Sequence, residues 1–135
     1  MTRIAKQSGL LLAAALVLLW PPAPAAAAER GELDGKTFVG TMTEKGKTRG
    51  DSDTFVFKDG KFRSTACDVY GFTETAYTVA VSDVATTFEA VATSPKEGTM
   101  RWKGTVKGDS VDGTAVWTKN GQADAIYTFK GALKK

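Results

Sequence analysis

Short segments that alternate apolar and polar residues fill the second half of this chain. The clearest pair is residues 100–106 (MRWKGTV) and 111–117 (VDGTAVW), which are separated by the tight Gly108-Asp109 turn. Alternation with period two is typical of strands that bury one face, and tight turns join such strands into an antiparallel meander. The pattern therefore predicts an all-β protein.

The same pattern continues upstream and downstream of this pair. Asp59-Gly60 and Asn120-Gly121 are dipeptides that favour type I′ hairpin turns. No segment predicts a helix, and no long crossover connection suggests a Greek key, so an open sandwich is the weaker alternative. We predict one domain folded as an eight-stranded antiparallel up-and-down β-barrel, with strands at 36–43, 54–57, 61–67, 72–81, 85–93, 100–106, 111–118 and 125–131.

The first 28 residues have the composition of a secretory signal. Arg3 and Lys6 precede an apolar stretch at 10–20, and small residues at 23–28 follow a proline-rich break. The apolar stretch is shorter than the ~20 residues that cross a bilayer. We therefore predict a signal peptide at 1–28, a β-barrel domain at 29–135 without a membrane span, and a periplasmic or secreted location.

The charge of the predicted mature chain is nearly balanced. The whole sequence has 18 Lys and Arg against 15 Asp and Glu, and removal of Arg3 and Lys6 with the signal leaves 16 basic residues. No basic stripe with interleaved aromatic residues remains, so no nucleic-acid partner is expected.

Cys67 is the one cysteine of the sequence. An internal disulfide is impossible, and a lone thiol in an oxidising compartment is either buried as a small core residue or available for an intermolecular bond. Both a monomer and a Cys67-linked dimer are compatible with the sequence, and burial is the preferred interpretation.

The predicted inward face combines large aromatic residues with glycines and alanines. Rings that interdigitate over the small residues would give a filled core, whereas rings that line the wall would leave a cavity for one small ligand. Trp102, Trp117 and Tyr127 are of most interest, because each has a polar atom that needs a partner when it is buried. The candidate ligand-binding residues are Phe38, Met42, Phe57, Phe88, Trp102, Trp117 and Tyr127.

The longest connection, residues 44–53, carries Lys45, Lys47 and Arg49 among small hinge residues. It can act as a mobile basic lid that attracts an anionic head group, or simply as an exposed solubilising loop. Asp51 and Asp53 lack the spacing of a calcium loop and are interpreted as part of a polar turn.

The sequence contains no histidine. Imidazole metal sites and Ser-His or Cys-His nucleophiles are therefore excluded. Glu89 is predicted to point outward, because it follows the inward Phe88 and adjacent residues of a strand face opposite sides of the sheet. We predict no catalytic residues, metal site or cofactor, and no enzymatic activity.

The opening of the domain, Leu33-Asp-Gly35-Lys-Thr-Phe38, resembles the Gly-x-Trp start of the first strand in the lipocalin-like (calycin) barrels. Here the aromatic residue is phenylalanine and the spacing is one residue longer. Together with the strand count, the resemblance implies a barrel with a mouth at one end and, as in many members, an apolar ligand inside.

Two functions follow as expectations. The preferred one is an exported, non-enzymatic barrel that binds a small hydrophobic or amphipathic ligand. The alternative is a protein-binding module, such as a secreted or periplasmic enzyme inhibitor, with an exposed patch at Val69, Tyr70 and Phe72.

Overall fold

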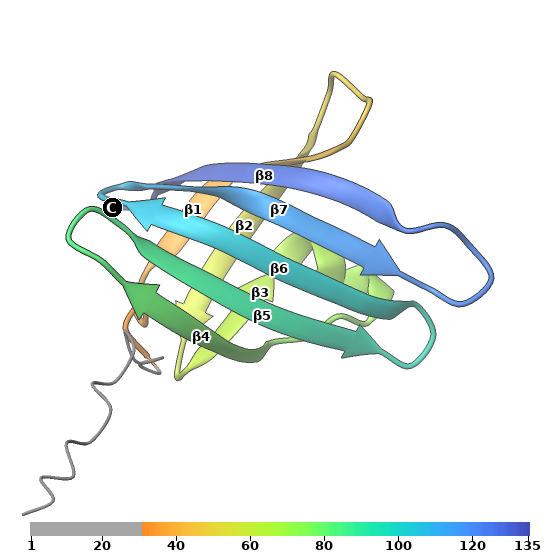
Figure 1. The fold of residues 1–135 in the computed structure, drawn as a ribbon, viewed down its shortest axis with the longest axis horizontal. Helices are drawn as coiled ribbons and strands as arrows, with labels where there is room; N and C mark the ends of the chain where they lie inside the picture. Colours follow the sequence, from red (N-terminus) through yellow and green to blue (C-terminus); the bar gives the residue numbers. More distant parts are fainter. Residues whose placement is uncertain (1–30) are drawn as a thin grey trace, which may run out of the picture.

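A computed structural model describes residues 31–135, and the predicted signal peptide at 1–28 lies outside them. The described chain forms a closed antiparallel barrel in which each strand pairs with the next and the last with the first (Figure 1). This confirms the predicted eight-stranded up-and-down barrel. The elements are β1 (Thr37–Glu44), β2 (Asp51–Lys58), β3 (Lys61–Ser64), the 3₁₀ helix η1 (Thr65–Tyr70), β4 (Thr75–Val81), β5 (Thr86–Ser94), β6 (Gly98–Lys107), β7 (Ser110–Thr118) and β8 (Ala125–Leu133).

Closure of the barrel depends on a glycine pair between β1 and β8. Gly40 is directly opposite Gly131, and a Cβ atom on Gly40 would lie 1.8 Å from the carbonyl oxygen of Lys130. Any side chain at Gly40 would therefore push the two closing strands apart.

A second glycine pair, Gly104 and Gly113, joins β6 and β7. A Cβ atom on Gly104 would lie 2.5 Å from the Phe88 ring, and one on Gly113 would lie 2.8 Å from the Phe129 ring. The small residues of the inward face therefore leave space for neighbouring rings, as expected for a densely packed core.

The two predicted type I′ turns have different outcomes. Asp59 and Gly60 have φ angles of 51° and 76°, as that turn requires, and they join β2 to β3 directly. Asn120 does not have a positive φ angle, and residues 119–124 form a longer loop between β7 and β8. The chain still turns at Asn120-Gly121, because the Gln122 N–H donates to the Lys119 carbonyl at 3.3 Å, but the predicted type I′ geometry is wrong.

The segment after β3 also differs from the prediction. The expected strand at 61–67 ends at Ser64 and continues as η1, and the next strand begins at Thr75 instead of at residue 72. The Asp53 carboxylate causes this break, because it accepts hydrogen bonds from the backbone N–H of Ala66 (3.0 Å) and from the Ser64 hydroxyl (2.5 Å). A side chain that binds local backbone groups competes with the strand ladder.

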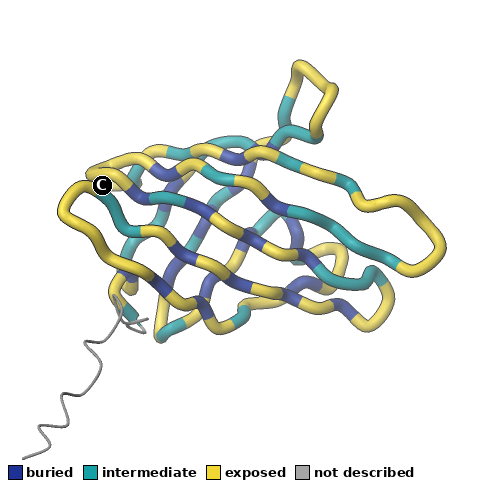
Figure 2. The backbone as a smooth tube through the Cα atoms, in the orientation of Figure 1, coloured by how far each residue is buried: buried dark blue, intermediate teal, exposed yellow. Residues whose placement is uncertain are grey.

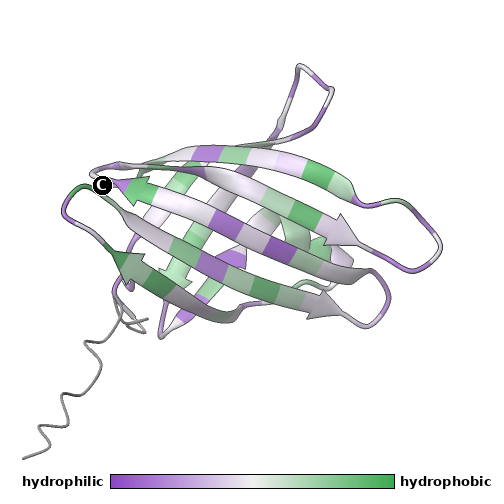
Figure 3. Cartoon of the chain, viewed as in Figure 1, coloured by the Kyte–Doolittle hydropathy of each residue, from purple (hydrophilic) through white to green (hydrophobic). Residues whose placement is uncertain are grey.

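Burial alternates along nearly every strand (Figure 2), in step with the alternation of hydropathy (Figure 3). Glu89 is exposed, as its strand parity predicted. Inward residues form one continuous hydrophobic core. Among residues 31–135, no helix is long and apolar enough to cross a membrane.

One end of the barrel is closed by the turn that precedes β1. Leu33 from this turn is buried, and its N–H donates a hydrogen bond to the Tyr77 hydroxyl at 3.0 Å. That hydroxyl donates in turn to the Asp34 carboxylate at 2.7 Å, and the same carboxylate accepts the N–H of Gly60 at 2.9 Å. The turn therefore seals the end at which β2 meets β3.

Candidate functional site

Four of the seven predicted ligand-binding residues lie in the filled part of the barrel. Phe38, Phe57, Phe88 and Trp102 are between 0 and 3% exposed. The Phe57 and Phe88 rings meet edge to face at a centroid distance of 4.9 Å, and Trp102 lies 5.0 Å from Phe62 and 5.2 Å from Phe129. These side chains fill the core and line no pocket.

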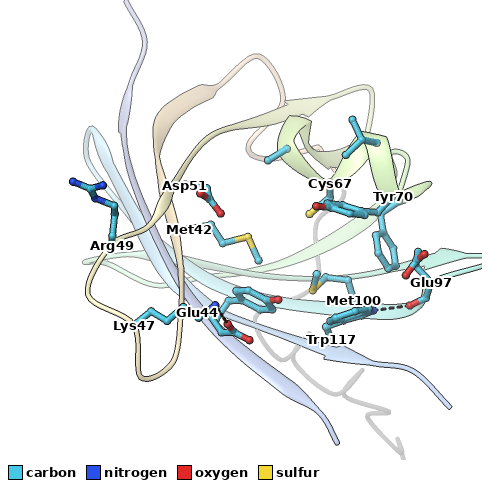
Figure 4. A pocket seen from close by; sticks show the side chains of 14 residues that line it. Met42, Glu44, Lys47, Arg49, Asp51, Cys67, Tyr70, Glu97, Met100 and Trp117 are labelled. Carbon is cyan, nitrogen blue, oxygen red and sulfur yellow. Dashed lines mark hydrogen bonds and ion pairs between the residues drawn. The ribbon is translucent and has the colours of Figure 1, made fainter. Parts of the chain in front are cut away.

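The other three predicted residues, Met42, Trp117 and Tyr127, come together at the opposite end. They line a pocket of about 520 Å³ that opens between the ends of β1, β6, β7 and β8 and the helix η1 (Figure 4). The barrel is therefore filled in its closed half and hollow at its open end. The lining residues are Met42, Glu44, Lys47, Arg49, Asp51, Ala66, Cys67, Val69, Tyr70, Phe72, Glu97, Met100, Trp117 and Tyr127.

Strand register places Met42 and Met100 directly above the aromatic core. Met42 is opposite Phe129, and Met100 lies one inward position before Trp102 on β6. Both methionines are buried. The two methionine side chains form the floor of the pocket and separate the hollow end from the filled half.

Trp117 and Tyr127 form one wall. Both are half-buried and point inward from neighbouring strands, with Trp117 opposite Ala125 and Tyr127 opposite Ala115. The Trp117 indole N–H donates to the backbone carbonyl of Glu97, so the ring offers only its apolar surface to the pocket.

The Tyr127 hydroxyl is different, because no side-chain hydrogen bond joins it to another of the residues 31–135. Burial raises the pKa of Tyr127, and the nearby carboxylate of Glu44 raises it further. The phenol is therefore protonated at neutral pH and can donate a hydrogen bond to a molecule in the pocket.

The opposite wall is η1, which is anchored at both ends. Asp53 holds its start, and Gly71 ends it with a φ angle of 86°. The Arg63 guanidinium binds the Asp68 carboxylate from outside, with Nε 3.0 Å from Oδ2. The buried Ser94 hydroxyl donates to the Tyr70 carbonyl at 2.8 Å and ties the end of η1 to the last residue of β5.

This anchoring turns Cys67 toward the pocket and leaves Val69 and Tyr70 at its rim. Cys67 is buried, as the preferred interpretation expected, and a Cys67-linked dimer gains no support. Burial raises the pKa of its thiol and outweighs a hydrogen bond to Ser64 that lowers it. Val69 and Tyr70 are 83% and 59% exposed, whereas Phe72, predicted to be exposed with them, is buried.

The predicted lid residues have two different positions. Lys47 and Arg49 line the pocket, and Lys45 does not. The Lys47 ammonium lies 2.8 Å from the Glu44 carboxylate, and this hydrogen bond raises the pKa of Lys47. The loop that carries these residues projects away from the barrel (Figure 1), and the Arg49 side chain points away from the centre of the pocket (Figure 4).

Sequence reasoning missed several lining residues. Met100 could have been found, because it shares the inward parity of Trp102. The inward position of Ala66 follows from the alternation with Phe62 and Ser64, whereas that of Cys67 could not be found, because η1 changes its direction relative to a strand. Asp53 was interpreted only as a turn residue, and its buried carboxylate instead positions η1.

The described part of the chain thus defines a closed eight-stranded β-barrel with one sealed end and, at the other end, a pocket with both apolar and charged lining residues. Within it, no cluster of Cys, Asp or Glu residues is arranged to hold a metal ion. Comparisons with protein-family models, with curated proteins and with solved structures find no match for the chain.

Proposed function

We propose that this protein is an exported, non-enzymatic carrier or sensor that binds a small hydrophobic or amphipathic molecule in the pocket at the open end. The observation that carries the proposal is the pocket itself. Its volume of about 520 Å³ lies within the range of small-molecule sites, and its lining combines an apolar floor and wall with charged and phenolic groups. The lipocalin-like resemblance of residues 33–38 supports the same function, and the signal-like residues 1–28 support export to the periplasm or medium.

Native mass spectrometry of the mature protein, purified from its own host, tests this proposal. We expect an excess mass that disappears when the same sample is denatured. A mass equal to that of the bare chain, with no uptake from a lipid or metabolite extract, would contradict it.

Matched valine variants show whether a bound molecule occupies this pocket. Val69 lines the pocket and is 83% exposed, whereas Val84 is 79% exposed on the β4–β5 turn at the sealed end. Val69→Ser should weaken retention of the molecule, and Val84→Ser should not. Because both side chains are exposed, neither substitution should change the free energy of unfolding by more than about 0.5 kcal/mol.

The second candidate is a protein-binding module, such as an inhibitor. It is favoured by the exposure of Val69 and Tyr70 side by side at the rim, since exposed apolar and aromatic side chains beside a pocket are typical of interfaces. Under this alternative, the Val69→Ser and Tyr70→Ser variants would abolish capture of a partner, and native mass spectrometry would detect no small molecule.

A further inference from the structure

The depth of the pocket limits what it can hold, if it binds a small molecule as proposed above. Glu44 at the rim and Met42 at the floor are two residues apart on β1, about 7 Å along the strand. Below Met42 and Met100 the rings of Phe55, Phe129 and Trp102 are at most 3% exposed, with the Phe55 and Phe129 centroids 5.0 Å apart. The volume of about 520 Å³ is therefore wide and shallow, and no channel continues into the barrel for an extended chain.

The side chains that line the pocket favour a ligand that contains an aromatic ring. Trp117 and Tyr127 offer aromatic surface on one side, and Tyr70 lies on the side of η1, opposite Trp117 (Figure 4). The remaining apolar surface includes the sulfur atoms of Met42, Met100 and Cys67. Thioether sulfur makes favourable contacts with aromatic ring edges, and aromatic faces prefer other rings.

The charges around the mouth balance. Glu44 pairs with Lys47 at 2.8 Å, and Glu97 pairs with Lys119 at 3.1 Å. The remaining charged lining residues, Asp51 and Arg49, are exposed and opposite in sign. The mouth therefore has no excess of positive charge that would select an anionic head group, and the protonated Tyr127 hydroxyl supplies a neutral hydrogen-bond donor.

We propose that the pocket selects a flat, uncharged ring compound with a hydrogen-bond acceptor over long-chain lipids. The ring lies against Trp117 and Tyr127 above the floor of Met42 and Met100, and the acceptor binds the Tyr127 hydroxyl. This inference rests on the proposed function and narrows it to one class of ligand.

Two methyl ketones of equal carbon count separate the ring from the chain: methyl naphthyl ketone and methyl decyl ketone. Dodecanoate adds the anionic chain. The mature protein contains two tryptophans, Trp102 in the core and Trp117 in the pocket, so its two indole N–H signals in an NMR spectrum report the two halves of the barrel separately. A Trp117→Phe variant assigns them.

We expect methyl naphthyl ketone to shift the Trp117 signal, to leave the Trp102 signal in place, and to bind about tenfold more tightly than either chain compound. Equal or tighter binding of methyl decyl ketone or dodecanoate at Trp117 would overturn the ring preference but leave the proposed function standing. If none of the three probes moves the Trp117 signal and the native protein carries no extra mass, both proposals fail.

Tyr127→Phe tests the hydrogen bond. It should weaken binding of methyl naphthyl ketone by about three- to tenfold and leave the binding of naphthalene itself unchanged. Equal weakening for both compounds would show that Tyr127 acts only as part of the wall, and would overturn the assignment of its hydroxyl as the donor.

Discussion

The two ends of this barrel have the same strand pattern but different closures. At the sealed end, the turn at residues 31–35 inserts Leu33, and the Tyr77 hydroxyl and the Asp34 carboxylate satisfy each other and two backbone N–H groups. At the open end, η1 is held to one side by Asp53 and Ser94, and the inward positions end in Met42, Met100 and Tyr127 around a pocket. Polar groups at the sealed end are used for structure, whereas the Tyr127 hydroxyl at the open end has no side-chain partner among residues 31–135 and donates to a ligand under the proposed function.

The difference shows how a barrel this small can combine a packed core with an open pocket. Contacting rings fill one half of the barrel, and the pocket lies in the other half, where fewer side chains pack against one another. Substitutions in the two halves should therefore separate stability from binding.

The largest effect is expected for Trp102→Ala in the filled half. Truncation of a ring that is 3% exposed and packed against Phe55, Phe62 and Phe129 should lower the free energy of unfolding by about 3–5 kcal/mol. Urea denaturation followed by circular dichroism measures this loss. A change below about 1 kcal/mol would mean that the core is not packed as described.

Tyr77→Phe tests the closure of the sealed end. It removes one hydroxyl and leaves the Leu33 N–H without its acceptor, so we expect a loss of about 1–3 kcal/mol, again by urea denaturation. The Asp34→Asn variant should lose less unfolding free energy, because the amide oxygen can still accept a hydrogen bond from the Tyr77 hydroxyl.

The same residue predicts a dependence on alkaline pH. Burial, and then the hydrogen bond to Asp34, raise the pKa of Tyr77 in the folded protein, so the unfolded chain ionises first as the pH rises past about 10. The contribution of Tyr77 to the free energy of unfolding is constant below that pH, and above it this free energy falls by up to about 1.4 kcal/mol per pH unit. Tyr77→Phe should make the decline shallower. Identical slopes for both proteins between pH 10 and pH 11 would contradict this assignment.

Trp117→Ala should affect binding more than folding. The ring is half-buried and its N–H partner, the Glu97 carbonyl, can be hydrated, so we expect a loss of about 1–2 kcal/mol in unfolding free energy. Binding of methyl naphthyl ketone should fall to an undetectable level by isothermal titration calorimetry, which does not depend on the Trp117 signal. A stability loss as large as that of Trp102→Ala would erase the distinction between the two halves.

Modification of the Cys67 thiol should reveal the smallest effect, a difference in reactivity and not in the free energy of unfolding. Because burial raises the pKa of its thiol, the folded protein should react with a disulfide reagent more slowly at pH 8 than the urea-unfolded chain, and should run as a monomer without reductant. A bound ring compound should slow the reaction further, since Cys67 lines the pocket. Rapid labelling of the folded protein, or a reducible dimer, would show that η1 does not bury this residue.

The strands could be predicted because each has a buried face with period two. That rule placed Phe38, Phe57, Phe88 and Trp102 inward, and it also contains the signal for Met100. It could not show that the first four fill the core while Met42, Trp117 and Tyr127 line a pocket, because both outcomes produce the same alternation.

The η1 segment shows the limit most clearly. Residues 61–67 continue an alternating pattern, yet the strand stops at Ser64, because a carboxylate from β2 captures the Ala66 N–H. A contact between segments distant in sequence therefore decides where this strand ends.

The sequence by itself determined the all-β class, the order of the strands and the inward face of most of them, because these follow from local alternation and turn chemistry. Only the tertiary structure decided which end is sealed, where η1 lies and which inward side chains remain uncovered. Those features depend on how side chains from different strands meet in three dimensions, and local periodicity contains no record of that packing.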